Sequence, residues 1–111
     1  MAGLNSREYE IIHNKEEITN ILIKRLECDK EFGNIIHDLL KTYNILMYDE
    51  YGNIRPFNDI LLDIKNVLLK IKGYIKKGIY SERDYEVQVV FLLTGLIGMR
   101  RFHEFREMLE V

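Results

Sequence analysis

The sequence of 111 residues has little of what marks a disulfide-rich, secreted or membrane-spanning protein. Its single cysteine, Cys28, cannot form an intramolecular disulfide, and its first residues lack the basic, apolar and small-residue regions of a secretory signal. The most apolar run, residues 87–99, is shorter than the roughly 20 residues that cross a bilayer. We therefore expect a cytoplasmic protein with a reduced thiol and no membrane span.

Neither sign of charge is in large excess, because 16 Lys and Arg residues stand against 18 Asp and Glu residues, for a formal net charge of −2. This balance gives no general attraction to phosphate, so nucleic-acid binding would need a local basic patch. The hydrophobic fraction of 47% and the charged fraction of 31% are typical of globular proteins. Since the length suits one hydrophobic core, we expect residues 1–111 to form a single helical domain.

Residues 87–99, VQVVFLLTGLIGM, place apolar side chains on every side of a helix, with one glutamine as the only strongly polar residue. A helix that is apolar all round is buried, so this run predicts a central helix from about 82 to 99, with Ser81 as its N-cap. Gly95 predicts the close approach of a neighbouring helix, because glycine otherwise costs about 1 kcal/mol inside a helix. At Gly98 two outcomes stay open, a break in the helix or a straight continuation.

Apolar residues also recur at spacings of three and four in other segments, which predicts further amphipathic helices. The expected helices span about 14–30 with Asn14 as the cap, about 34–48, and about 58–77 with Asn58 as the cap and Gly78 as the stop. These elements predict an all-α fold, a compact bundle of four to five helices around the central one. The turn-forming residues 49–53 indicate a loop, and a small hairpin over 45–57 is the alternative for its flanks.

The residues that usually carry chemistry are scattered along the chain. His13, Cys28, His37 and His103 show none of the spacings of a zinc site. Glu10 and His13 match one pair of the motif found in carboxylate-bridged di-iron bundles, but that site needs a second pair and two further glutamates. The sequence also contains no glycine-rich phosphate loop and no nucleophile motif. We therefore expect no enzymatic activity, no metal and no cofactor.

Two groups of basic residues indicate an alternative function as a nucleic-acid-associated regulator. They lie on the predicted third helix and in the C-terminal segment, and comprise Lys65, Lys72, Lys76, Arg100, Arg101 and Arg106. Such clusters can neutralise phosphates. Aspartate and glutamate residues are interspersed with them, however, and mixed charge is the usual pattern of a solvated face. The sequence therefore favours nucleic-acid binding less than contact with another protein.

The C-terminal segment has a narrow apolar stripe formed by Phe102, Phe105 and Leu109. A helix of about ten residues is too short to be stable alone in water, so this stripe must dock on another surface. That surface is either the protein's own bundle or a second copy or partner, and we favour docking between copies because the central helix already has three amphipathic helices to cover it. Without a chemical site, we expect a small protein-interaction module, such as an adaptor, an inhibitor or the subunit of a homodimer.

Overall fold

The computed structural model describes the backbone of residues 6–111 and the side chains from His13 onward. Within that range the fold is all-α, with two short 3₁₀ helices (η) and no strand. The elements are α1 (Ser6–Glu27), η1 (Asp29–Phe32), α2 (Ile35–Thr42), α3 (Phe57–Lys76), α4 (Glu82–Ile97), η2 (Met99–Arg101) and α5 (Phe102–Leu109). The five α-helices confirm the predicted fold class. In the described part of the chain, no helix is both long enough and apolar enough to cross a membrane.

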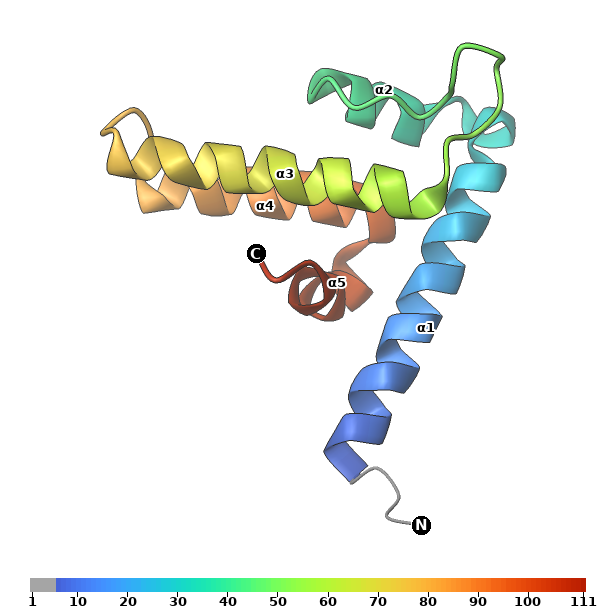
Figure 1. Ribbon diagram of the computed structural model, residues 1–111, viewed down its shortest axis with the longest axis horizontal. Helices are drawn as coiled ribbons and strands as arrows, with labels where there is room; N and C mark the ends of the chain where they lie inside the picture. Colours follow the sequence, from blue (N-terminus) through green and yellow to red (C-terminus); the bar gives the residue numbers. More distant parts are fainter. Residues whose placement is uncertain (1–5) are drawn as a thin grey trace.

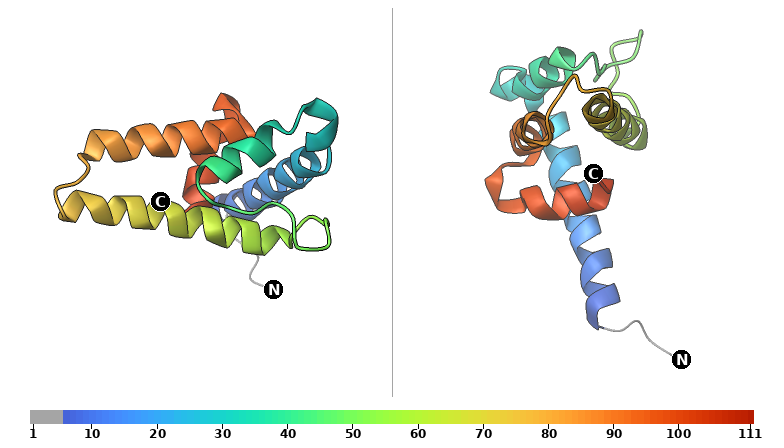
Figure 2. Two further views of the ribbon diagram at one scale, coloured as in Figure 1. Left: turned by 90° about the horizontal axis from the view of Figure 1, so that it is seen from above. Right: turned by 90° about the vertical axis from the view of Figure 1, so that its left-hand side faces the viewer.

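The central element is α4, because it contacts α1, α2, α3 and α5. It forms an antiparallel hairpin with α3, and α2 lies on one side of this hairpin while α5 lies on the opposite side (Figure 1 and Figure 2). The long helix α1 crosses near the end of the hairpin where α3 begins and α4 ends. The prediction of a central helix is therefore confirmed.

One hydrophobic core lies around α4. Val89, Leu92 and Leu93 of this helix have no exposed surface. The other side chains of the core with no exposed surface are Ile18 of α1, Leu40 of α2, Leu68 of α3 and Phe105 of α5. Every α-helix therefore contributes at least one fully buried side chain to the core around α4.

The start of α4 follows the sequence prediction. The Ser81 hydroxyl accepts a hydrogen bond from the Asp84 N–H at 3.1 Å, and the Asp84 carboxylate accepts one from the Ser81 N–H at 3.0 Å. This reciprocal pair is a capping box, which satisfies donors that the first turn of a helix leaves without a partner. The hydrogen bonds from Ser81 also lower the pKa of Asp84.

The two glycines near the end of α4 are required for different structural reasons. A Cβ added at Gly95 would lie 2.5 Å from Cδ2 of Leu39, so the predicted close approach is confirmed and the neighbour is α2. Gly98 has a φ of 87°, a left-handed value that favours glycine, and α4 ends at Ile97. The chain therefore breaks at Gly98, and the alternative of a straight helix into the C-terminal segment is excluded.

The boundaries predicted for the first helix were wrong. The structure begins α1 at Ser6, so Asn14 lies inside the helix and is not its cap, and the helix ends at Glu27 instead of near residue 30. The chain then turns through Gly33 (φ 87°) and Asn34 (φ 60°), which both adopt left-handed conformations. A residue that can cap a helix also occurs inside helices, so Asn14 alone did not define a start.

The second predicted helix was also too long. The structure ends α2 at Thr42, and Ile45 and Met47 are buried from an irregular loop that follows. The alternative of a hairpin is reduced to one antiparallel bridge between Tyr48 and Ile54. Helical spacing therefore predicted the burial of Met47 correctly, but not the secondary structure in which it lies.

The third predicted helix has the right end and a slightly wrong start. Pro56 occupies the N-cap position and α3 begins at Phe57, so Asn58 is the second helical residue and not the cap. The helix ends at Lys76, and Gly78 adopts the expected left-handed conformation with a φ of 73°. The lysine-rich end and the glycine were sufficient to define this terminus.

Candidate interaction surfaces

The C-terminal stripe lies in the core of its own chain. Phe102, Phe105 and Leu109 are 8%, 0% and 4% exposed, and α5 packs against α4 and α1. In this fold the stripe docks within the molecule, so the favoured prediction of docking between copies is corrected. Because α2 lies on the opposite side of the hairpin (Figure 1), this flank of α4 is open to α5.

A different apolar surface is exposed, on the side of α4 that faces away from α3. It consists of Val87, Val90, Phe91 and the half-buried Thr94, and we call it the outer face of α4. Val87, Val90 and Phe91 are 55%, 38% and 56% exposed. Their spacing of three and four residues makes them neighbours on one helical surface. The sequence prediction that α4 is buried on all sides is therefore wrong for this flank.

The outer face carries no charged side chain between its ends. Its neighbour Glu86 is turned toward α5, where both carboxylate oxygens accept hydrogen bonds from the Arg106 guanidinium, each at 2.6 Å. These hydrogen bonds lower the pKa of Glu86, so the carboxylate stays ionised and paired. The hydroxyl of Thr94 donates to the carbonyl oxygen of Val90 and so has a partner within the helix. What remains exposed is methyl groups and an aromatic ring.

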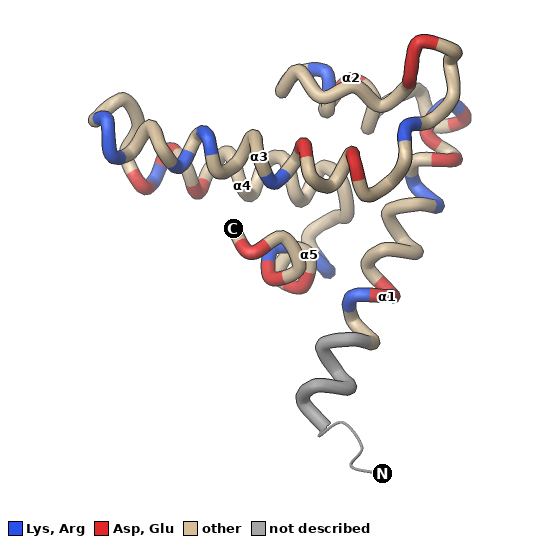
Figure 3. The backbone as a smooth tube through the Cα atoms, viewed as in Figure 1, with Lys and Arg blue, Asp and Glu red and all other residues tan. Residues whose placement is uncertain are grey.

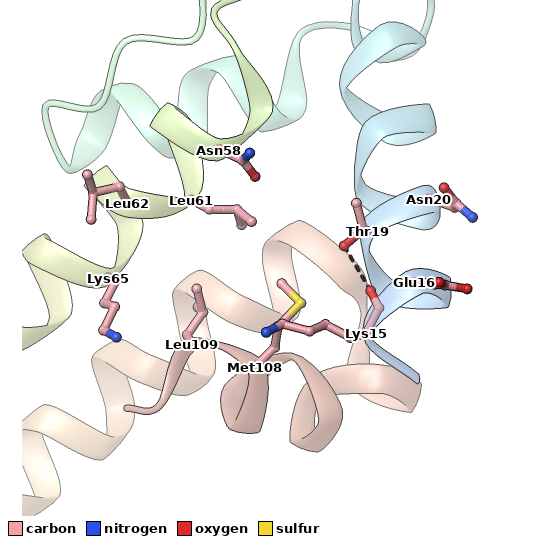
Figure 4. Close-up of a pocket in the computed structure, with 10 residues that line it drawn as sticks. All are labelled: Lys15, Glu16, Thr19, Asn20, Asn58, Leu61, Leu62, Lys65, Met108 and Leu109. Atoms are coloured by element: carbon pink, nitrogen blue, oxygen red, sulfur yellow. Dashed lines mark hydrogen bonds between the residues drawn. The ribbon is translucent and has the colours of Figure 1, made fainter. Parts of the chain in front are cut away.

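A second candidate is an open groove between α1 and α3 with α5 at its base (Figure 4). Its volume is about 660 Å³. The base is apolar, because it is formed by Leu61, Met108 and Leu109, and Leu62 at one wall is 56% exposed. The groove is thus large enough for side chains of another molecule.

The lysines of this groove already cover part of its base. The side chain of Lys15 points from α1 toward Met108, whereas Glu16 points away from the groove (Figure 4). Lys65 points from α3 toward α5, where its Nζ lies 3.5 Å from a carboxylate oxygen of Glu110. Lysine stems commonly lie along apolar surface with the ammonium group in water. The groove is therefore a weaker candidate than the outer face of α4, where Val87 and Phe91 are more than half exposed.

The basic residues do not form one surface. Arg106 is held by Glu86, Arg101 is paired with Glu17, and Lys65 lies near Glu110. Figure 3 shows acidic residues interspersed with basic ones along α3, α4 and α5. The predicted nucleic-acid patch is therefore divided among separate ion pairs.

The remaining members of the predicted patch are far less restrained. Lys72 lies over the ring of Tyr85 at 5.9 Å, beside the pair of Glu86 and Arg106. Lys76, near the end of α3, and Arg100, in η2, are exposed. Of the six predicted residues, the structure thus brings only Lys72 and Arg106 to a common neighbour, and a carboxylate lies between them.

The histidines and the cysteine are likewise apart. In the part of the chain whose side chains are described, no group of three or more His, Cys, Asp or Glu residues could hold a metal ion. Glu10 lies outside that part, so the spacing of Glu10 and His13 is not tested. The chain matches no family model, no curated protein and no solved structure.

Sequence reasoning missed the outer face because its residues are as apolar as the buried ones. Val87 and Phe91 differ from Val89 and Leu92 only in which side of the helix they occupy. The sequence contained no signal that separates the two sets, because the side of α4 that stays open depends on how the other helices pack. The second helix was itself predicted too long, so its true extent could not reveal the open side.

Proposed function

We propose that this chain is a protein-interaction module and that the outer face of α4 is its contact surface. The observation that supports this is the exposure of Val87, Val90 and Phe91 on a helix whose other large apolar side chains are buried. Contiguous apolar patches on the surface of a folded protein usually mark sites of contact with other molecules. A protein that covered this face would remove its apolar area from water, which is the main favourable term in association.

The shape of the face suits a helix of the partner. Its residues follow the spacing of a helical stripe, so a second helix laid along α4 contacts all of them. Valine and phenylalanine have few side-chain rotamers to lose, and binding therefore costs little conformational entropy. The partner is either a second copy of this chain or a different protein, for which the chain would be an adaptor, an inhibitor or a subunit. Because the only cysteine is unpaired, we place this interaction in the reducing cytoplasm.

The test compares Phe91→Glu with Leu69→Glu, a matched control on the exposed side of α3. Leu69 is 42% exposed, so the control adds the same charge at a comparable surface position. Light scattering over a concentration series measures self-association, and cross-linking followed by mass spectrometry identifies other partners. We expect association in the wild type and in Leu69→Glu, and its loss in Phe91→Glu, while circular dichroism shows that all three chains are folded.

Two results would overturn this proposal. The first is a wild type that is monomeric at every concentration and forms no cross-link that depends on Phe91. The second is submicromolar binding of duplex or single-stranded probes at physiological salt, weakened by Lys72→Glu. That second result would favour a function as a nucleic-acid-associated regulator. The ion pairs that Arg101 and Arg106 form with carboxylates argue against that function.

A further inference from the structure

A separate pocket lies where the end of α1 meets η1 and the start of α2, away from the groove of Figure 4. Its volume is about 510 Å³, within the range of ordinary ligand sites. Ile21 and Ile36 contribute apolar wall, and Phe32 and Ile35 continue that wall. Lys24 and Arg25 bring two cations to the same pocket.

The acidic group of this pocket is the carboxylate of Asp29, which already accepts hydrogen bonds within the protein. Asp29 is only 2% exposed, and its two carboxylate oxygens accept hydrogen bonds from the N–H groups of Ile36 and His37, each at 2.8 Å. These donors belong to the first turn of α2, which has no other side-chain cap. Asp29 thus holds η1 and α2 in place and leaves no free carboxylate for the neighbouring cations.

The cations of the pocket have no such partner. Neither Lys24 nor Arg25 forms an ion pair with a carboxylate of the described side chains, and both are exposed. The Arg25 guanidinium lies near Gly98, where an added Cβ would be 3.9 Å from Nη1. The accessible charge of this pocket is therefore positive, in contrast to the groove, where Glu110 lies near Lys65.

The apolar surface extends beyond the cavity itself. Phe32 and Ile35 are 69% and 63% exposed, although they flank a turn that Asp29 and the left-handed Gly33 hold in a defined conformation. Both side chains line the cavity and also present apolar surface to solvent. A length of polypeptide that crosses the turn would cover them, and carboxylates on it would complement the two cations.

We propose that this pocket binds an acidic segment of a partner protein, with an apolar side chain of that segment in the cavity and its carboxylates on Lys24 and Arg25. The apolar side chain supplies affinity by burial, whereas the carboxylates select the segment and fix its direction. This site is independent of the outer face of α4, so the chain would have two contact surfaces and could join two proteins.

The test is a selection of random short peptides, displayed on phage, against the wild-type chain. We expect the enriched peptides to combine Asp or Glu with Phe, Leu or Ile, and to bind with an affinity that falls as salt rises. The double substitution Lys24→Glu with Arg25→Glu should weaken them by about tenfold or more, because it replaces attraction by repulsion. Lys41→Glu, an exposed change elsewhere on α2, is the control and should leave binding unchanged.

Cys28 gives an independent report of where the peptides bind. It is the only cysteine of the chain and it lines this pocket, so an enriched peptide should slow its alkylation by a maleimide. Enrichment of neutral or basic peptides, no enrichment, or equal binding by the double variant would each overturn the proposal. Protection of Cys28 by dodecanoate and not by any acidic peptide would also overturn it, in favour of a small carboxylate ligand. Peptide binding that survives in Phe91→Glu separates this site from the outer face of α4.

Discussion

The two faces of α4 have the same kind of residues and opposite environments. Val89, Leu92 and Leu96 on the inner face are at most 2% exposed, whereas Val87 and Phe91 on the outer face are more than half exposed. Both faces belong to one helix with one cap, so neither helix propensity nor hydrophobicity distinguishes them. The difference shows that burial is decided by which neighbouring helices lie over a side chain.

The neighbours of α4 explain which face is covered. Leu39 of α2 approaches Gly95, and the Tyr43 hydroxyl, just after α2, donates to the Gln88 side chain at 2.7 Å, which fixes α2 along one flank. Arg106 of α5 binds Glu86 and fixes the opposite flank, while α3 covers the side between them. The fourth side is the outer face, and none of the described helices lies over it. The following substitutions test this division, beginning with the largest expected effect.

Phe105→Glu should prevent folding or nearly do so. Phe105 has no exposed surface, and a carboxylate in its place would be buried without a partner, which costs far more than a lost contact. The loss of helical circular dichroism, or a strongly lowered melting temperature, should not depend on protein concentration, because α5 docks within the chain. A folded monomer that has lost only its ability to associate would show instead that α5 serves an interface.

Leu92→Ala and Val87→Ala should differ sharply, although they lie on one helix. Leu92 is fully buried, so we expect a loss of about 2–5 kcal/mol in the free energy of unfolding, measured by urea titration. Val87→Ala should change it by less than about 0.5 kcal/mol, because little contact is lost and alanine favours the helix. Equal losses at the two positions would mean that the outer face is covered within the monomer.

Local signals allowed several elements to be predicted from the sequence. Ser81 and Asp84 marked the start of α4, and Gly78 marked the end of α3, because capping chemistry acts within a few residues of chain. Ile45 and Met47 were predicted to be helical and are not, since a loop that follows a helix can also bury its apolar side chains in the core. The spacing of apolar residues indicates which side chains cluster together. It does not determine the conformation of the backbone between them.

The candidate surfaces were harder to predict than the elements. The pocket beside Phe32 depends on Asp29, whose carboxylate reaches seven and eight residues along the chain to cap α2. No standard capping motif has that spacing, so no local pattern predicted this cap. The sequence does place apolar Phe32 and Ile35 on both sides of Gly33. Because turn residues are usually exposed, this pattern indicates apolar side chains at the surface.

Gly95→Leu tests the flank of α4 that α2 covers, and should cost about 1–3 kcal/mol through overpacking against Leu39. Gly95→Ala is the finer probe, because one methyl group meets only the flexible end of the Leu39 side chain. In a Leu39→Ala background that obstacle is absent, so Gly95→Ala should stabilise the chain by up to about 1 kcal/mol through helix propensity. If Gly95→Ala has the same effect in both backgrounds, Leu39 does not limit the space at Gly95.

The smallest expected effect concerns Glu86, the residue that borders the outer face and binds α5. Glu86→Gln removes a partly exposed ion pair with Arg106, so we expect a loss of about 0.2–1 kcal/mol at neutral pH. Hydrogen bonds from Arg106 lower the pKa of Glu86 in the folded state, so the stabilisation is complete above the ordinary glutamate pKa. It should disappear as the pH falls through the lowered folded-state value, because the carboxylate is then protonated in both states.

The pH dependence distinguishes this ion pair from simple packing by Glu86. The difference in unfolding free energy between wild type and Glu86→Gln, measured by urea titration at a series of pH values, should fall toward zero only in acid and should shrink in high salt. Glu16→Gln is the matched control, since Glu16 forms no ion pair with the described side chains and is exposed. A difference that stays constant down to the lowest pH would mean that Glu86 holds α5 through contact alone. Glu86 would then be turned away from the outer face by the packing of α5, and not by its attraction to Arg106.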